Sequence, residues 1–107
     1  MHHTLRSAAL LAALTTFAAT TGLAQSTGQA LYTEKCQACH GPTGLADSGI
    51  GKVMHVKPIA DPEIKKLSEA EMIQMVRAGA GKMQPYKGEL SDAQIKAAVD
   101  YLRSFVK

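Results

Sequence analysis

The last part of the chain places apolar residues among polar ones with the period of an α-helix. Ser91 and Gln94 have the pattern of a capping box, in which side chains bond the first free backbone amides of a helix. The pattern therefore predicts a helix that begins after Ser91 and turns one apolar stripe toward the core. The apolar positions of this stripe are Ile95, Ala98, Val99, Leu102 and Phe105.

Two earlier stretches are also predicted to be helical. Residues 67–79 carry a second capping box, Ser68 with Glu71, and they end at a glycine, a common residue at helix ends. A first helix is expected over residues 27–38. Residues 41–64 are rich in glycine and proline, which predicts a loop. A loop this long is unusual in a compact domain, unless it lies against a cofactor that replaces part of the core.

The first 24 residues have the order of segments found in a secretory signal peptide. Arg6 lies in a short polar start, small apolar residues follow, and Gly22 and Ala24 occupy the minus-three and minus-one positions of a cleavage site. The apolar stretch falls short of the roughly 20 strongly apolar residues of a transmembrane helix. We therefore expect a signal peptide at residues 1–24 and one domain at residues 25–107. An uncleaved membrane anchor and a buried helix are the alternatives.

The composition narrows the classes of function. The formal net charge is +3 and 20% of the residues are charged, which falls well short of the dense basic patch of a nucleic-acid-binding protein. We therefore expect no nucleic-acid partner. A domain of this size buries only about 60% of the surface of its unfolded chain. Such domains usually need disulfides, a metal or a cofactor to be stable.

The two cysteines, Cys36 and Cys39, are followed directly by His40. A disulfide between them would close a very short loop and stabilise little. A thioredoxin-like redox pair is expected after a strand, which the pattern does not predict. A tetrahedral zinc site would need four ligands, and the chain could offer only Cys36, Cys39, His40 and His55. Cys39 and His40 are adjacent, which makes it difficult to place both around one metal. The C-x-x-C-H pattern is instead that of covalent haem c attachment, with the histidine on the iron.

Met83 lies in a segment, residues 79–88, that is rich in glycine and lysine. Methionine normally fills a core, but a thioether opposite a histidine is a known axial arrangement in c-type cytochromes. Met83 is therefore the candidate for the second axial ligand, and packing on the haem edge is the alternative. His55 would give a bis-histidine site, and Met54 is a further competitor. Two more methionines fall at core-facing positions of the middle helix: Met72 and Met75.

In these segments the chain resembles the small class I (monohaem) c-type cytochromes. The resemblance covers residues 27–106. In that family a proline usually follows the ligand methionine directly, whereas here Gln84 stands between Met83 and Pro85. The resemblance rests on the attachment motif, the middle helix, and the methionine loop with the terminal helix, in that order: residues 36–41, 67–79 and 81–105.

The resemblance implies an all-α fold, a small cytochrome c-like helical domain wrapped around a covalently attached haem, with a long Gly/Pro-rich loop. It places the covalent thioether sites on Cys36 and Cys39 and the axial iron ligands on His40 and Met83. In this family the first and last helices cross at a small residue and aromatic rings. The corresponding candidates here are Gly28, Tyr32 and Tyr101. A ligating histidine also nearly always donates its second ring proton, and we expect a carbonyl from residues 47–58 to accept it.

The function implied by the resemblance is electron transfer by one haem c that cycles between Fe(II) and Fe(III), and not an enzymatic reaction. We expect an exported bacterial monomer in the periplasm, without stable membrane insertion after signal cleavage, that meets redox partner proteins transiently. The alternatives are a ligand-binding or catalytic haem protein with an open or bis-histidine sixth position, and a haem subunit of a larger oxidoreductase complex. Lysines near the methionine loop would favour an acidic docking surface on the partner: Lys52, Lys57, Lys82 and Lys87.

Overall fold

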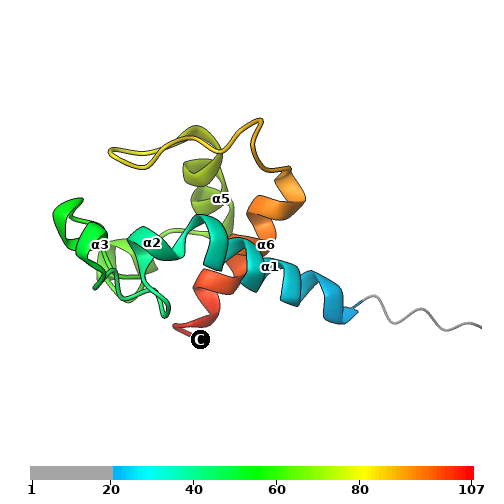
Figure 1. Ribbon diagram of the computed structural model, residues 1–107, viewed down its shortest axis with the longest axis horizontal. Coiled ribbons are helices and arrows are strands. Elements are labelled where there is room, and N and C mark those ends of the chain that lie inside the picture. The colour runs from blue at the N-terminus through cyan, green and yellow to red at the C-terminus, as the bar shows by residue number, and fades with distance from the viewer. Residues whose placement is uncertain (1–20) are drawn as a thin grey trace, which may run out of the picture.

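The computed structural model describes the backbone of residues 21–107 and the side chains from residue 27 onward. The described residues form helices joined by loops, with two isolated β-bridges and no strand (Figure 1). The predicted all-α class is therefore confirmed. The helices are α1 (Thr21–Lys35), α2 (Gln37–His40), α3 (Gly49–Val53), α4 (Pro62–Lys65), α5 (Glu69–Ala78) and α6 (Asp92–Ser104).

The predicted signal peptide, residues 1–24, lies outside the described residues except for its last four positions, which belong to α1. Within residues 21–107, no helix combines the length and the hydrophobicity needed to cross a bilayer. The division of the chain into residues 1–24 and 25–107 stays a prediction.

Both predicted capping boxes are present. The Ser68 hydroxyl accepts from the Glu71 amide at 3.1 Å, and the Glu71 carboxylate accepts from the Ser68 amide at 2.7 Å. Ser91 and Gln94 repeat the arrangement at 3.1 and 2.8 Å. Because each pair satisfies two amides that have no partner within their helix, α5 and α6 begin at the residues that the sequence indicates. Gly79 follows α5 as its C-cap, as predicted.

Helices α1 and α6 cross at Gly28. A Cβ atom at this position would lie 2.5 Å from the Ala97 carbonyl oxygen, so a side chain would force the two helices apart. Beside the crossing, the Tyr32 ring lies 5.3 Å from the Tyr101 ring and 5.8 Å from the Phe105 ring, between centroids. The predicted crossing at Gly28, Tyr32 and Tyr101 is therefore confirmed, and Figure 1 shows α1 and α6 crossing each other.

The first helix differs from the predicted span. Instead of one helix over residues 27–38, α1 ends at Lys35 and the short α2 follows after Cys36. In an unbroken helix the Cys39 amide would donate to the Lys35 carbonyl. It donates to the Cys36 carbonyl instead, at 3.2 Å, which leaves the last carbonyl of α1 without a partner from its own helix.

The predicted loop over residues 41–64 contains α3 and the start of α4. Each of these helices begins at a side-chain N-cap, which was not predicted because the surrounding glycines and prolines indicated a loop. The Ser48 hydroxyl accepts from the Gly51 amide at 3.0 Å, and the Asp61 carboxylate accepts from the Glu63 amide at 2.8 Å.

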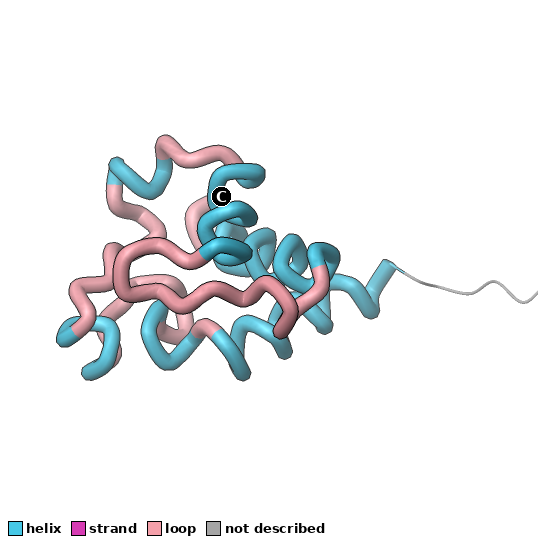
Figure 2. Tube along the Cα trace, turned by 90° about the horizontal axis from the view of Figure 1, so that it is seen from above, coloured by secondary structure: helices cyan, strands magenta, loops and turns pink. Residues whose placement is uncertain are grey.

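The core combines side chains from distant parts of the sequence. The loop from α5 to α6 runs over the top of the molecule (Figures 1 and 2) and adds buried side chains to those of the helices. The core residues that contact one another are Ile59, Met72, Tyr86, Leu90, Ile95 and Val99.

Candidate functional site

An apolar pocket lies between α1, α2, α5, α6 and the loops that precede α4 and α6. Its volume is about 770 Å³ including the open mouth, and its lining is predominantly apolar, as is typical of ligand and cofactor pockets. Three of the predicted site residues, Cys36, His40 and Met83, line it. Aliphatic and thioether side chains make up most of the remaining wall, among them Ile59, Leu67, Met72, Met75, Val99 and Leu102.

The attachment motif is held in place by α1. The Cys36 amide donates to the Tyr32 carbonyl at 2.9 Å, and the His40 amide donates to the Cys36 carbonyl at 3.0 Å, which closes the single turn of α2. After this turn, the buried Tyr32 hydroxyl donates to the Gly41 carbonyl at 2.6 Å. Tyr32 therefore fastens both ends of the motif to α1 and fixes the side of the pocket from which His40 enters.

Burial changes the acid–base behaviour of the motif. Burial, with a smaller effect of the neighbouring Cys39 thiol, raises the pKa of the Cys36 thiol to about 11. Burial also lowers the pKa of His40, so its imidazole is neutral at neutral pH and has a lone pair free for a metal. A thioredoxin-like cysteine has a lowered pKa. The direction of the shift at Cys36 is therefore opposite to that expected for a redox dithiol.

Met83 reaches the pocket from a tight turn. The Met83 amide donates to the Ala80 carbonyl at 2.9 Å, and the Ala80 amide donates to the Met83 carbonyl at 3.1 Å. Gly79 precedes the turn with φ +79°, and a Cβ atom there would lie 2.8 Å from the Met83 carbonyl oxygen and 3.0 Å from the Pro85 nitrogen. Glycine is required at position 79 because both the left-handed dihedral and the close approach exclude a side chain. The Met83 side chain is half-buried against the core.

The fourth predicted site residue, Cys39, lies outside the pocket lining. It is half-buried in α2. Cys36 and Cys39 are both free thiols, and no cluster of three or more His, Cys, Asp and Glu side chains that could hold a metal occurs within residues 21–107.

The expected hydrogen bond from the His40 ring to a carbonyl in residues 47–58 is not formed in the described part of the chain.

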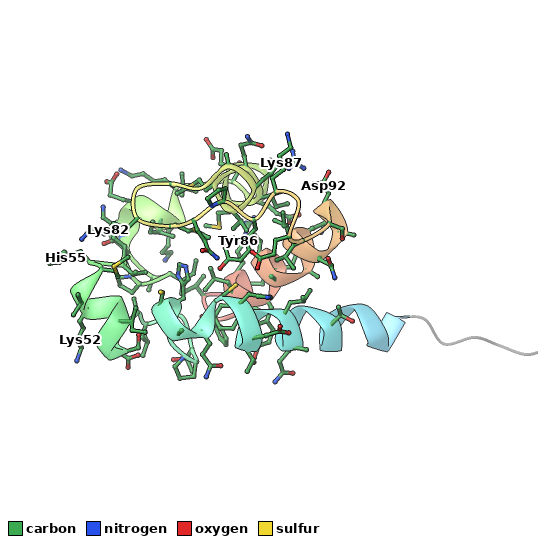
Figure 3. All side chains as sticks on the ribbon, turned by 45° about the horizontal axis from the view of Figure 1, so that its top comes forward. Lys52, His55, Lys82, Tyr86, Lys87 and Asp92 are labelled. Carbon is green, nitrogen blue, oxygen red and sulfur yellow. The ribbon has the colours of Figure 1, made fainter. Side chains whose placement is uncertain are left out.

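The positions of His55 and Met54 distinguish them from Met83 as candidates for the second axial ligand. His55 is exposed, and Figure 3 shows it at the outer edge of the molecule, at the end that also carries Lys52 and Lys82. Neither His55 nor Met54 lines the pocket. Met72 and Met75, predicted as core or wall residues of the middle helix, both line it, and Met72 is buried in the core cluster.

Tyr86 is a site residue that the sequence reasoning did not single out. It is 7% exposed, lines the pocket, and donates its hydroxyl proton to the Lys35 carbonyl at 3.0 Å. The signal in the sequence was its surroundings, because Tyr86 is the only aromatic residue in a segment of lysines and glycines that was already expected to lie against a cofactor.

The four lysines proposed to steer partners do not form one group. Lys57 lines the mouth of the pocket, and Figure 3 shows Lys52 and Lys82 toward the same end of the molecule, with Lys87 apart from them near Asp92. Among the described residues, these lysines form no ion pair. Other basic side chains do pair with acids: Lys35, Lys66, Arg77, Lys96 and Arg103.

The side chains of the pocket fit a covalently bound haem c. Haem c attachment uses thiols next to an axial histidine, and in His/Met cytochromes a methionine thioether is the second axial donor. The pocket presents the Cys36 thiol and the neutral imidazole of His40 from one short motif, and the thioether of Met83 from the loop before α6. Its walls are otherwise mainly hydrocarbon, and Cys39 lies in the same turn as His40.

Comparisons with known proteins agree with this fit. Residues 23–102 match the family described as cytochrome c oxidase, cbb3-type, subunit III. A solved structure, the KustC0563 c-type cytochrome, superposes with a TM-score of 0.67 and 32% sequence identity, over 75% of this chain and 98% of that one.

A curated relative shares the same domain within a longer protein. The dihydro-haem d1 dehydrogenase of Pseudomonas aeruginosa is 36% identical over 81 residues, which are 73% of this chain and 15% of the relative. The match therefore spans only a small part of that relative's length. The fold, the pocket and the family match lead to one conclusion: the chain belongs to the cbb3-type cytochrome c oxidase subunit III family and is a c-type cytochrome domain, whose cofactor is covalently bound haem c.

Proposed function

We propose that this domain transfers single electrons, with haem c attached at Cys36 and Cys39 and held axially by His40 and Met83. The observation that carries the proposal is that His40 and Met83, from α2 and from the loop before α6, line the same apolar pocket as Cys36. When bound, the haem supplies an iron that changes between Fe(II) and Fe(III) without a change in its ligands.

The side chains of the pocket favour the reduced state. His40 offers a neutral imidazole and Met83 an uncharged thioether, so neither adds negative charge that would stabilise Fe(III). The hydrocarbon wall keeps water out and lowers the local dielectric constant, which disfavours the extra positive charge of Fe(III). We therefore expect a positive reduction potential. If His40 and Met83 both hold the iron, no coordination site would remain for a substrate, which supports a carrier and not an enzyme.

The visible spectrum of the exported, haem-loaded protein tests this proposal. The reduced protein should show the narrow bands of low-spin haem c. The oxidised protein should show the weak far-red band of sulfur bound to ferric iron. Low-spin haem bands without the far-red band would overturn Met83 as ligand, and a protein without haem would overturn the whole proposal.

The partner is proposed to dock at the pocket mouth, in the periplasm to which the predicted signal peptide would lead. Lys57 lines the pocket, Lys52 and Lys82 lie together at one end of the molecule (Figure 3), and none of the three forms an ion pair within the described part of the chain, so these positive charges are free to attract an acidic partner. Exposed apolar residues lie in and before α3: Leu45, Ile50 and Val53. A surface that combines apolar contacts with a basic rim suits a small, short-lived complex with an acidic protein.

Salt dependence tests the electrostatic part of this docking proposal. The oxidation of the reduced protein by ferricyanide, an anionic one-electron oxidant, should slow as ionic strength rises from about 0.01 to 0.15 M, because the Debye length falls from about 30 to about 8 Å. The triple variant Lys52→Gln, Lys57→Gln, Lys82→Gln should be slower by a factor on the order of 10 at low salt. Lys107→Gln, at the C-terminus, is the control. A flat salt response in the unsubstituted protein would contradict steering.

A second candidate is a domain or subunit fixed within a larger oxidoreductase. It is favoured by the curated relative, a dehydrogenase of which the matched region is 15%, and by the exposed side chains of Leu45, Ile50 and Val53. The native size of the haem-containing species separates the two candidates. A carrier should sediment as a single small protein, whereas a fixed subunit should sediment with its complex at any salt concentration.

A further inference from the structure

We propose that Tyr86 positions Met83 by tying the methionine loop to the end of α1. This inference rests on the proposed ligation of iron by Met83. The Tyr86 hydroxyl donates to the Lys35 carbonyl at 3.0 Å, across 51 positions of the sequence. Lys35 is the residue directly before Cys36, so one hydrogen bond joins the segment that carries the proposed thioether and histidine to the segment that carries the proposed methionine.

Tyr86 is anchored at every polar group it has. Its amide donates to the Val76 carbonyl at 3.0 Å, which fastens it to the last turns of α5. Its own carbonyl accepts from the amides of Glu89 and Leu90, at 3.0 and 2.9 Å, which closes the turn that leads toward α6. Because its ring is also buried in the core cluster, Tyr86 anchors the loop to the rest of the domain.

The Lys35 carbonyl can accept the hydrogen bond from the Tyr86 hydroxyl because the break between α1 and α2 leaves it without a partner in its own helix. The Cys39 amide, which would donate to it in an unbroken helix, donates to Cys36 instead. A carbonyl at a helix end needs a hydrogen bond from a side chain or water. Tyr86 supplies it from within the pocket wall, so the same helix break that orients Cys36 and His40 also creates the acceptor for the loop.

Met83 is held between two anchors. On one side the turn from Ala80 to Met83 is closed by two backbone hydrogen bonds, and on the other side Tyr86 is only three positions away. Pro85 lies in this short span and restricts its backbone further. A displacement of Tyr86 is therefore transmitted to the Met83 thioether. The ion pair from Lys35 to Glu89, at 3.6 Å, joins the same two segments, but both side chains are partly exposed and contribute little.

Imidazole titration of the ferric haem-loaded protein tests this role, because imidazole must displace the methionine to bind. In Tyr86→Phe the ring remains and only the hydroxyl is lost. We expect imidazole to bind about 3- to 10-fold more tightly, the size expected for the loss of one net hydrogen bond, and the far-red band to disappear at a lower temperature than in the unsubstituted protein.

Two matched variants separate positioning from general stability. Tyr32→Phe removes an equivalent hydroxyl that bonds Gly41, on the His40 side of the pocket, and should lower the unfolding temperature while changing imidazole affinity less than Tyr86→Phe. Tyr101→Phe, whose ring packs at the crossing of α1 and α6, should resemble the unsubstituted protein.

The outcomes distinguish this inference from the proposal on which it rests. An unsubstituted protein without the far-red band would overturn the ligation by Met83, and Tyr86's role with it. A far-red band of equal strength and an unchanged imidazole affinity in Tyr86→Phe would overturn the role of Tyr86 alone. Equal tightening in Tyr86→Phe and Tyr32→Phe would also overturn it, because a merely structural contribution would then account for both.

Discussion

Replacement of Met83 by alanine is expected to abolish the far-red sulfur-to-iron band while leaving the haem attached. The reduction potential should fall on the order of 0.1 V or more, within the range of about 0.8 V over which axial ligands set haem potentials. The physical reason is that the thioether favours Fe(II) and excludes water, whereas alanine at this half-buried position opens the pocket to water. Spectroscopy and a redox titration measure both effects.

Met75→Ala is the matched control for this variant. Met75 also lines the pocket and carries the same thioether, but it projects from α5 and not from the loop. We expect the far-red band to survive in Met75→Ala with a small change in potential from the altered wall. Loss of the band in Met75→Ala and its survival in Met83→Ala would transfer the ligand role to Met75.

The second large effect is expected in the double variant Cys36→Ala, Cys39→Ala. No haem should remain with the chain after denaturing electrophoresis, because both proposed covalent bonds are gone. The yield of folded protein should fall sharply as well. Haem staining of the denatured protein measures attachment, and far-ultraviolet circular dichroism measures the helical content that survives.

We expect folding to depend on the attachment, because the pocket lies in the middle of the hydrophobic core. Core residues such as Met72 and Tyr86 also form its wall, so without a tightly held cofactor their apolar surfaces would face water. A domain of this size has little other core to compensate. The single variants Cys36→Ala and Cys39→Ala should each keep one covalent bond and stain for haem. Haem that resists denaturation in the double variant would show that another residue attaches it.

Local patterns in the sequence were sufficient to predict the helices that frame the site. The capping boxes at Ser68 and Ser91 form as predicted, because their partners lie three positions away and the geometry of one helical turn brings them together. The buried face of α6 follows the same logic, with Ile95 and Val99 in the core. The caps at Ser48 and Asp61 are equally local but lie in a stretch whose glycines and prolines pointed to a loop.

The sequence alone was sufficient to propose Cys36, Cys39, His40 and Met83 as the site residues, because their chemical types and order indicate haem c attachment and ligation wherever the chain places them. Only the tertiary structure decided which of them share a wall, that His55 faces outward, and that Tyr86 reaches the Lys35 carbonyl. The physical reason is distance along the chain. Helix caps and motifs depend on neighbours a few positions away, whereas a pocket wall and a hydrogen bond across 51 positions depend on how α1, α5 and α6 pack together.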